Sequence, residues 1–82
     1  MSEPALLAVV GETMIALRTR LGLDVEAAAT LARIDAQRLA EAEAGELAID
    51  EHELVALADA YGLEVTAFFG GRTTPLSYLA GA

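Results

Sequence analysis

The sequence predicts an all-α protein, a compact domain of five helices. Alanine and leucine, which favour helix, occur 18 and 13 times in the 82 residues, whereas β-branched residues are sparse and scattered. Glycines follow the apolar-periodic stretches and aspartates precede them, as residues that end and begin helices do. A chain of this length has room for one domain, because it buries only about 60–65% of its unfolded surface.

The first helix is expected over about residues 4–21. Pro4 suits the first helical turn, where a backbone N–H would have no partner. Apolar residues follow at alternating steps of three and four, which places them on one face of the helix: Leu7, Val10, Met14, Leu17 and Leu21. Gly22 marks the end of this helix.

Aspartates mark the starts of the next two helices. Asp24 precedes a helix over about residues 25–32, and Asp35 precedes one over about residues 36–44. Only residues 33–35 connect them. Two short helices joined by three residues, the first rich in alanine, have the layout of a helix-turn-helix unit.

A fourth helix is expected over about residues 51–61, where Asp50 and Glu53 have the spacing of a capping box. A fifth, short helical turn is expected at residues 66–69. One core should unite these elements, with these residues inside it: Leu17, Leu21, Ala28, Leu31, Leu39, Leu54, Leu57, Ala58 and Phe68.

The composition excludes several classes of function. The chain has no cysteine, so it can form neither a disulfide framework nor a thiolate metal site, and His52 is its single histidine. None of the 13 carboxylates sits beside a nucleophile or a phosphate-binding loop, so we expect no catalytic residue and no cofactor. The apolar run near the start has six residues, whereas a membrane span needs about 20. We therefore expect a cytoplasmic protein with no bound metal and no membrane partner.

An ordered set of residues runs without a gap from position 11 to position 45: Gly11-Glu12, Ala16-Leu17-Arg18, Gly22-Leu23-Asp24, Ala29, Ile34, Leu39 and Glu43-Ala44-Gly45. The stretch from Leu54 to Leu63, followed by Phe68-Phe69, continues it. In this order the residues resemble the phage repressor/Cro family of helix-turn-helix proteins, the xenobiotic-response-element (XRE) group. The resemblance covers roughly residues 10–69 and implies a repressor-like domain.

The resemblance implies a structural ion pair and a DNA-reading surface. Arg18 and Glu43 would form the ion pair, which joins the first and third helices. The third helix would be the recognition helix in the major groove of double-stranded DNA. Contacts to DNA would come from its start and outer face and from nearby arginines: Ala36, Gln37, Arg38, Glu41, Arg33 and Arg20.

These side chains have the chemistry for reading bases. Gln37 can pair with adenine, and Glu41 can accept a hydrogen bond from cytosine. Arg38 can reach either a guanine or a phosphate. Arg33 stands in the turn, where the family often has glycine, and a left-handed backbone there would cost an arginine about 1–2 kcal/mol. Arg33 is then either a strained DNA contact or, as we favour, a tolerated turn residue.

The charge distribution leaves a second function open. Formal net charge is −8, and between Asp24 and Glu64 there are 11 acidic residues and two basic ones. Such a surface repels phosphates and slows association with DNA. The alternative function is an acidic helix-turn-helix module that binds a basic protein partner and no DNA. A positive rim around Gln37 would favour DNA, and a uniformly negative face would favour the alternative.

A homodimer is the expected assembly. Ala8, Gly11 and Ile15 form a second apolar patch on the first helix, opposite its main stripe. The helix-turn-helix domain is expected to cover residues 1–69, followed by an apolar tail over residues 70–82. The tail either folds back over Ile15 within one subunit or helps to form a dimer or partner interface, for which we expect Ile15, Leu76, Tyr78 and Leu79.

Overall fold

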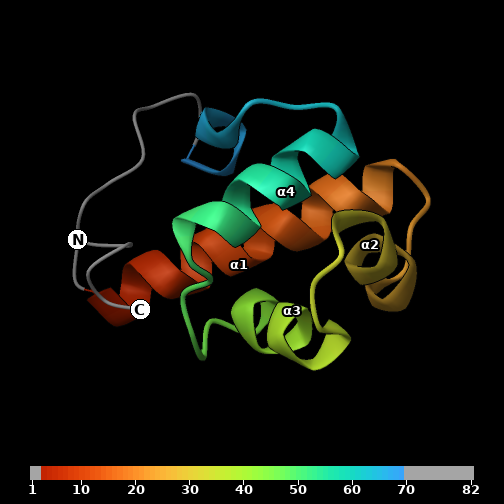
Figure 1. Cartoon of the computed structure of the whole chain (residues 1–82). Helices are drawn as coiled ribbons and strands as arrows, with labels where there is room; N and C mark the ends of the chain where they lie inside the picture. Colours follow the sequence, from red (N-terminus) through yellow and green to blue (C-terminus); the bar gives the residue numbers. More distant parts are fainter. Residues whose placement is uncertain (1–2, 70–82) are drawn as a thin grey trace.

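The computed structural model describes residues 3–69 of the chain. These residues form four α-helices and one 3-10 helix, without a strand (Figure 1): α1 Glu3–Arg20, α2 Val25–Ala32, α3 Ala36–Glu43, α4 Glu51–Tyr61 and η1 Val65–Phe69. The all-α class predicted from the sequence is confirmed. The five helices predicted from the sequence are not all present in residues 3–69: the segment expected to form the fifth lies in the 3-10 helix η1, a form that suits so short a segment.

The three aspartates expected to begin helices do so. Asp24 and Asp35 accept hydrogen bonds from backbone N–H groups three and two residues further on, at 2.8 and 2.9 Å. At the start of α4, Asp50 accepts from the backbone N–H of Glu53 at 2.7 Å, and Glu53 accepts from that of Asp50 at 3.0 Å. This reciprocal pair is a capping box, which satisfies two N–H groups that a helix start leaves free.

All four α-helices end in the same way. Just beyond each helix stands one residue with a left-handed backbone, followed by two backbone hydrogen bonds that reach back into the last turn. The residue is glycine after α1, α3 and α4, and it is Arg33, with φ 59°, after α2. Arg33 therefore takes a conformation that glycine adopts without a steric penalty.

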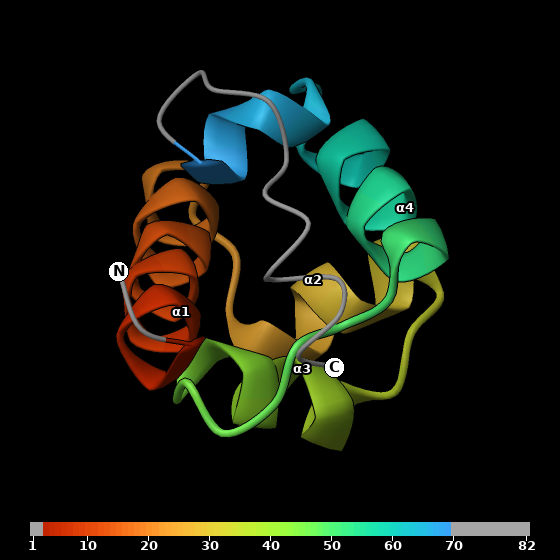
Figure 2. The same cartoon turned by 90° about the vertical axis from the view of Figure 1, so that its left-hand side faces the viewer.

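The helices contact one another in a closed ring around the core. α1 contacts α3, α3 contacts α2, α2 contacts α4, and η1 contacts both α4 and α1. Figure 2 shows α1 and α4 on opposite sides, with η1 at the top and α2 and α3 at the bottom. Because η1 closes the ring, Phe68 and Phe69 of η1 are buried together with residues from all four α-helices.

Most of the residues predicted in the core are buried: Ala28, Leu39, Leu54, Leu57, Ala58 and Phe68, with Leu17 partly buried. The prediction was wrong for Leu21 and Leu31, which are 51% and 58% exposed. Leu21 lies beyond the end of α1, where the chain turns away. Leu31 lies off the buried face of α2, which consists of alanines.

Gly11 marks the closest approach of α1 to α3. A Cβ atom placed on Gly11 would lie 2.4 Å from the carbonyl oxygen of Glu43 and 2.7 Å from that of Ala42. Nearby, a Cβ atom on Gly45 would lie 3.0 Å from the Cα atom of Ala8. The second apolar patch expected on α1 is therefore divided. Gly11 is buried against the last residues of α3, whereas Ile15 is exposed, and so is Ala8 although its backbone lies close to Gly45.

Among residues 3–69, no helix has both the length and the apolar content that crossing a membrane requires.

Candidate nucleic-acid interface

α2 and α3 form the helix-turn-helix unit. The side of α2 that faces the core carries Ala28, Ala29 and Ala32, whose small side chains let α3 and α4 pack closely against this helix. Between the two helices, the Arg33 N–H donates to the Thr30 carbonyl at 3.2 Å. The Arg33 side chain is exposed. The backbone bond from Arg33 to Thr30 helps to hold the turn in its left-handed conformation.

α3 has one buried face and one solvent-facing side. Leu39, Ala42 and Glu43 are buried, all in the second half of the helix or at its middle. Gln37 is exposed near the start, where the Asp35 side chain caps the helix. The remaining residues expected to touch DNA on this helix are half-buried: Ala36, Arg38 and Glu41.

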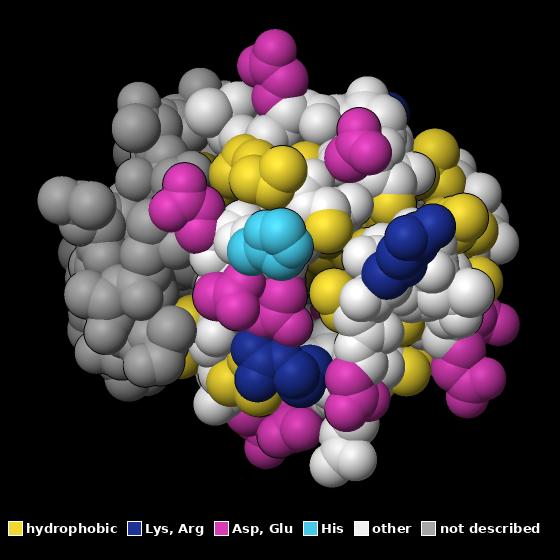
Figure 3. Space-filling view, in the orientation of Figure 1, with side chains coloured by type: hydrophobic (Ala, Val, Ile, Leu, Met, Phe, Trp, Pro, Cys, Tyr) yellow, Lys and Arg dark blue, Asp and Glu magenta, His cyan; other side chains and the backbone are white. Residues whose placement is uncertain are grey.

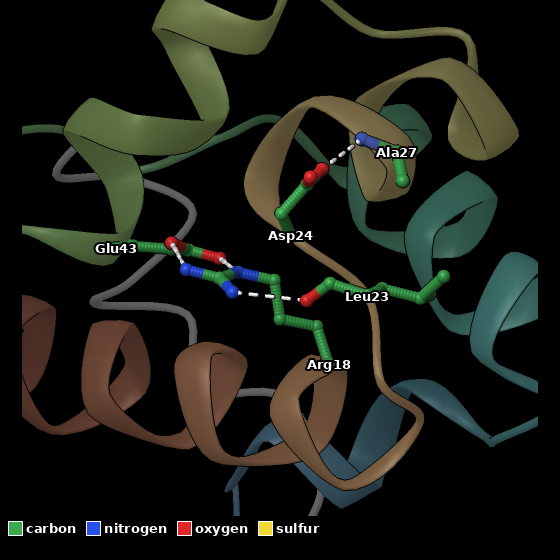
Figure 4. A network of polar contacts seen from close by, with 5 residues as sticks. All are labelled: Arg18, Leu23, Asp24, Ala27 and Glu43. Atoms are coloured by element: carbon green, nitrogen blue, oxygen red, sulfur yellow. Dashed lines mark hydrogen bonds and ion pairs between the residues drawn. The ribbon is translucent and has the colours of Figure 1, made fainter.

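Arg18 and Glu43 form the ion pair that the family resemblance implied. Nε of Arg18 donates to Oε2 of Glu43 at 2.7 Å, and Nη2 donates to Oε1 at 2.9 Å (Figure 4). Nη1 of Arg18 also donates to the Leu23 carbonyl at 3.1 Å, which ties the connection between α1 and α2 to the pair. The two side chains are 18% and 6% exposed, and the hydrogen bond to Glu43 raises the pKa of Arg18.

A second pair, Arg38–Glu53, was not predicted from the sequence. Nε of Arg38 donates to Oε2 of Glu53 at 2.9 Å, and Nη2 donates to Oε1 at 2.6 Å. The Arg38 side chain is 44% exposed and that of Glu53 is 14% exposed. Hydrogen bonding to Arg38 holds the pKa of Glu53 below its ordinary value of 4.5. The residue expected to contact DNA is therefore already engaged by the capping-box glutamate of α4.

Acidic residues dominate the surroundings of α3. From residue 36 to residue 53, Arg38 is the single lysine or arginine in the sequence, alongside six acidic residues. On the face of the molecule in Figure 3, acidic side chains adjoin the lower of the two main arginine groups and are scattered over the rest of the face. Beside Gln37, the charge of Arg38 is matched by that of Glu53.

The structure does not bring Arg20 to the α3 face. Together with Leu17, Leu21, Tyr61 and Leu63, Arg20 lines a pocket of about 280 Å³ at the C-terminal end of α4. Arg38, by contrast, pairs with the first turn of that same helix. An 11-residue α-helix is about 16 Å long, which separates the two arginines.

Tyr61, which also lines this pocket, is 5% exposed. Within the described part of the chain, its hydroxyl group has no hydrogen-bond partner. Burial, reinforced by the charge of Glu43, raises the pKa of Tyr61 to about 12. The hydroxyl group is thus close enough to the Arg18–Glu43 pair to be affected by both charges without bonding to either.

The remaining predicted residues concern assembly and ligands. Ile15 is 38% exposed on α1, and the tail residues Leu76, Tyr78 and Leu79 lie outside the described residues. In residues 3–69 no three His, Asp or Glu side chains are grouped so as to hold a metal ion. In the described structure, the α3 face therefore presents the amide of Gln37, the arginine Arg38 paired with Glu53, and several carboxylates.

Comparison with known families gives one match. A family model described as a helix-turn-helix domain matches residues 10–67, which cover α1 from Val10 onward, the whole of α2, α3 and α4, and η1 as far as Ala67. No curated protein and no solved structure matches the chain significantly.

Proposed function

The chain belongs to the helix-turn-helix domain family, and from this we propose that it is a DNA-binding transcriptional regulator of the repressor/Cro type. In this proposal α3 is the recognition helix and enters the major groove of double-stranded DNA. The observation that carries it is the solvent-facing start of α3, where Gln37 is exposed beside a partly exposed Arg38.

Four residues on or beside this face have the following roles in the proposal. Gln37 hydrogen-bonds an adenine, and Glu41 accepts from the N4 amino group of a cytosine. Ala36 is small enough for α3 to approach the groove closely. Arg33, exposed in the turn that precedes α3, reaches a phosphate.

The acidic surroundings set the character of the binding. Few phosphates are neutralised, so the affinity depends weakly on salt, with a slope of about 0.9 per phosphate contact. Base contacts, which carry the sequence preference, then contribute more to the affinity than non-specific attraction to phosphates does.

The regulator acts as a homodimer in this proposal. Ile15 and Val9 are exposed apolar residues on α1, 38% and 45% exposed, and they give the subunit a surface for self-association. We propose that Leu76, Tyr78 and Leu79 complete the interface. Sedimentation that shows a monomer at high micromolar concentration would overturn this part of the proposal.

Selection from a random-sequence duplex library tests the DNA-binding function. The full chain should enrich a defined sequence at about 50 mM salt, a concentration at which phosphate contacts are strong. Gln37→Ala should then weaken binding to the enriched duplex and relax the preference at one base pair, by about 1–3 kcal/mol. Arg20→Ala is the control for a substitution away from α3 and should leave the base preference unchanged, because Arg20 lies at the far end of α4.

One observation favours a second function, that of a module binding a basic protein. Arg38, the basic residue of the α3 face, is neutralised by Glu53, which leaves that face negative. Charge complementarity would attract a basic partner to it. The second function replaces the first if no duplex is enriched at low salt while an arginine-rich peptide binds and Glu41→Gln weakens that binding.

A further inference from the structure

The Arg38–Glu53 pair uses one edge of the guanidinium group. An arginine side chain has five N–H donors in a rigid plane. Glu53 accepts from Nε and from one N–H of Nη2, at 2.9 and 2.6 Å, so both carboxylate oxygens face the side edge of Arg38. Because two parallel bonds fix a plane, this contact sets the orientation of the whole group.

The terminal edge of the same group is unused. Nη1 of Arg38 has no hydrogen-bond partner among residues 3–69, and Nη2 retains a second N–H. Those two nitrogens form the terminal fork, which can bind two acceptor atoms at once, such as guanine O6 and N7 or two phosphate oxygens. The exposed part of the pair is Arg38, at 44%, whereas Glu53 is 14% exposed.

Glu53 is itself held from a second direction. Its Oε1 accepts the backbone N–H of Asp50 at 3.0 Å, and its own backbone N–H donates to Asp50 at 2.7 Å. The carboxylate is thus fixed by the start of α4 before it meets Arg38. A side chain anchored in this way can position another group more firmly than a free surface glutamate can.

We propose that Glu53 is a positioning residue for DNA recognition: it holds the side edge of Arg38 so that the terminal edge binds a pair of acceptor atoms on DNA. This inference rests on the proposed DNA-binding function. Fixing a long side chain in advance removes the ordering cost that a mobile arginine would pay on binding, which corresponds to about two- to tenfold in affinity.

Charge alone and the positioning role of Glu53 predict opposite changes in DNA affinity when Glu53 loses its charge. Removing a carboxylate from a face that meets phosphates should strengthen binding, because like-charge repulsion is reduced. If Glu53 positions Arg38, its removal should instead weaken binding relative to removal of a neighbouring carboxylate. Glu51, exposed in the same first turn of α4, provides that comparison.

The experiment measures affinity for the enriched duplex with wild type, Glu53→Gln and Glu51→Gln. Glutamine can keep the capping bond through its amide oxygen, while its NH₂ group then faces Nε–H of Arg38 and cannot accept from it. NMR relaxation of the Arg38 Nε–H group, recorded without DNA, reports whether the side chain has been released. Thermal unfolding of each variant checks that the domain remains folded.

We expect Glu53→Gln to bind about two- to tenfold more weakly than Glu51→Gln, and its Arg38 Nε–H group to become mobile. Loss concentrated at one G·C pair identifies guanine as the acceptor, whereas uniform loss across sequences identifies phosphate. Equal or tighter binding by Glu53→Gln, or an Arg38 that stays ordered in it, overturns the inference. A wild type that enriches no duplex overturns the proposed function itself, and the two failures are therefore distinct.

Discussion

The two arginine–glutamate pairs of this domain have the same bonding pattern and different surroundings. In both, Nε and Nη2 of the arginine donate to the two carboxylate oxygens. Arg18–Glu43 is mostly buried between α1 and α3, whereas Arg38 is 44% exposed next to α4. The third donor also differs, since Nη1 of Arg18 bonds the Leu23 carbonyl while that of Arg38 has no partner within residues 3–69.

This difference separates a structural role from the recognition role that we propose for Arg38. A buried pair cannot lose one member without leaving an uncompensated charge, so it contributes to holding the helices together. An exposed pair contributes little to stability, because water competes for both partners. Its remaining donors are free to meet a ligand. In our proposal the same motif therefore serves two purposes in one small domain, and the degree of burial decides which.

The largest expected effect comes from breaking the buried pair. Glu43→Gln should lower the free energy of unfolding by about 3 kcal/mol, because Arg18 would remain buried without a countercharge. In a domain of this size the midpoint of thermal unfolding should fall by more than about 10 °C. Glu41→Gln, on the same helix but without an ion pair in the described structure, is the control. An equal effect from the two variants would contradict the structural role of the buried pair.

Separating α1 from α3 tests the geometry on which the buried pair depends. Gly11→Ala places a methyl group 2.4 Å from the Glu43 carbonyl oxygen, so the helices must move apart. We expect a net loss of about 1–3 kcal/mol in chemical denaturation, although alanine is the better helix former. Ala16→Gly, at an exposed position of α1, is the reverse control, with a loss of at most about 1 kcal/mol. An unchanged midpoint for Gly11→Ala would show that the close approach is not needed.

Tyr61 tests the environment of the buried pair. Tyr61→Phe removes a buried hydroxyl group that has no partner in the described structure, so we expect a gain of about 1 kcal/mol. The pH dependence gives a second measurement. Because the folded-state pKa of Tyr61 is about 12 and its ordinary value is 10.0, unfolding releases a proton above pH 10. Stability should therefore fall between about pH 10 and pH 12 more steeply in wild type than in Tyr61→Phe.

The smallest effect is expected from the exposed pair. Glu53→Gln should lower the free energy of unfolding by less than about 1 kcal/mol at neutral pH. The folded-state pKa of Glu53 lies below its ordinary value of 4.5, so the stabilisation is present above that value and is lost as the pH falls through the folded-state pKa. Unfolding midpoints of wild type and variant should therefore converge in acid. A gap that widens with acidification would contradict the sign of this shift.

The sequence was sufficient to predict those features that short-range rules decide. Asp24, Asp35 and Asp50 begin helices because a carboxylate can reach N–H groups only two or three residues away, a constraint visible in the sequence. Hydrophobicity alone misplaced Leu31, because α2 packs through alanines that permit a close approach. Tertiary packing overrode residue size at that position.

The exposed pair shows what sequence reasoning could not provide. Arg38 and Glu53 were each assigned a role, the first on DNA and the second in the capping box. Their meeting depends on how the connection between α3 and α4 brings two helices together, and no local pattern encodes that path. Arg18–Glu43, separated by 25 residues, was available only through the resemblance to a known family. The site residues could be proposed from the sequence, whereas the contact between Arg38 and Glu53 could not.

The distribution of buried contacts along α3 has a consequence for its motions. An isolated helix of eight residues is marginal in water, so α3 depends on its neighbours for order. Its second half is anchored by Ala42 and Glu43, whereas its first turn is held by the Asp35 cap and by the bond from Arg38 to Glu53. Amide hydrogens near Glu43 should therefore exchange with solvent only when the whole domain unfolds. Amide hydrogens just after the first turn of α3 should exchange when that turn frays locally. The end of α3 that we propose to read DNA is thus the end that can open without unfolding the domain.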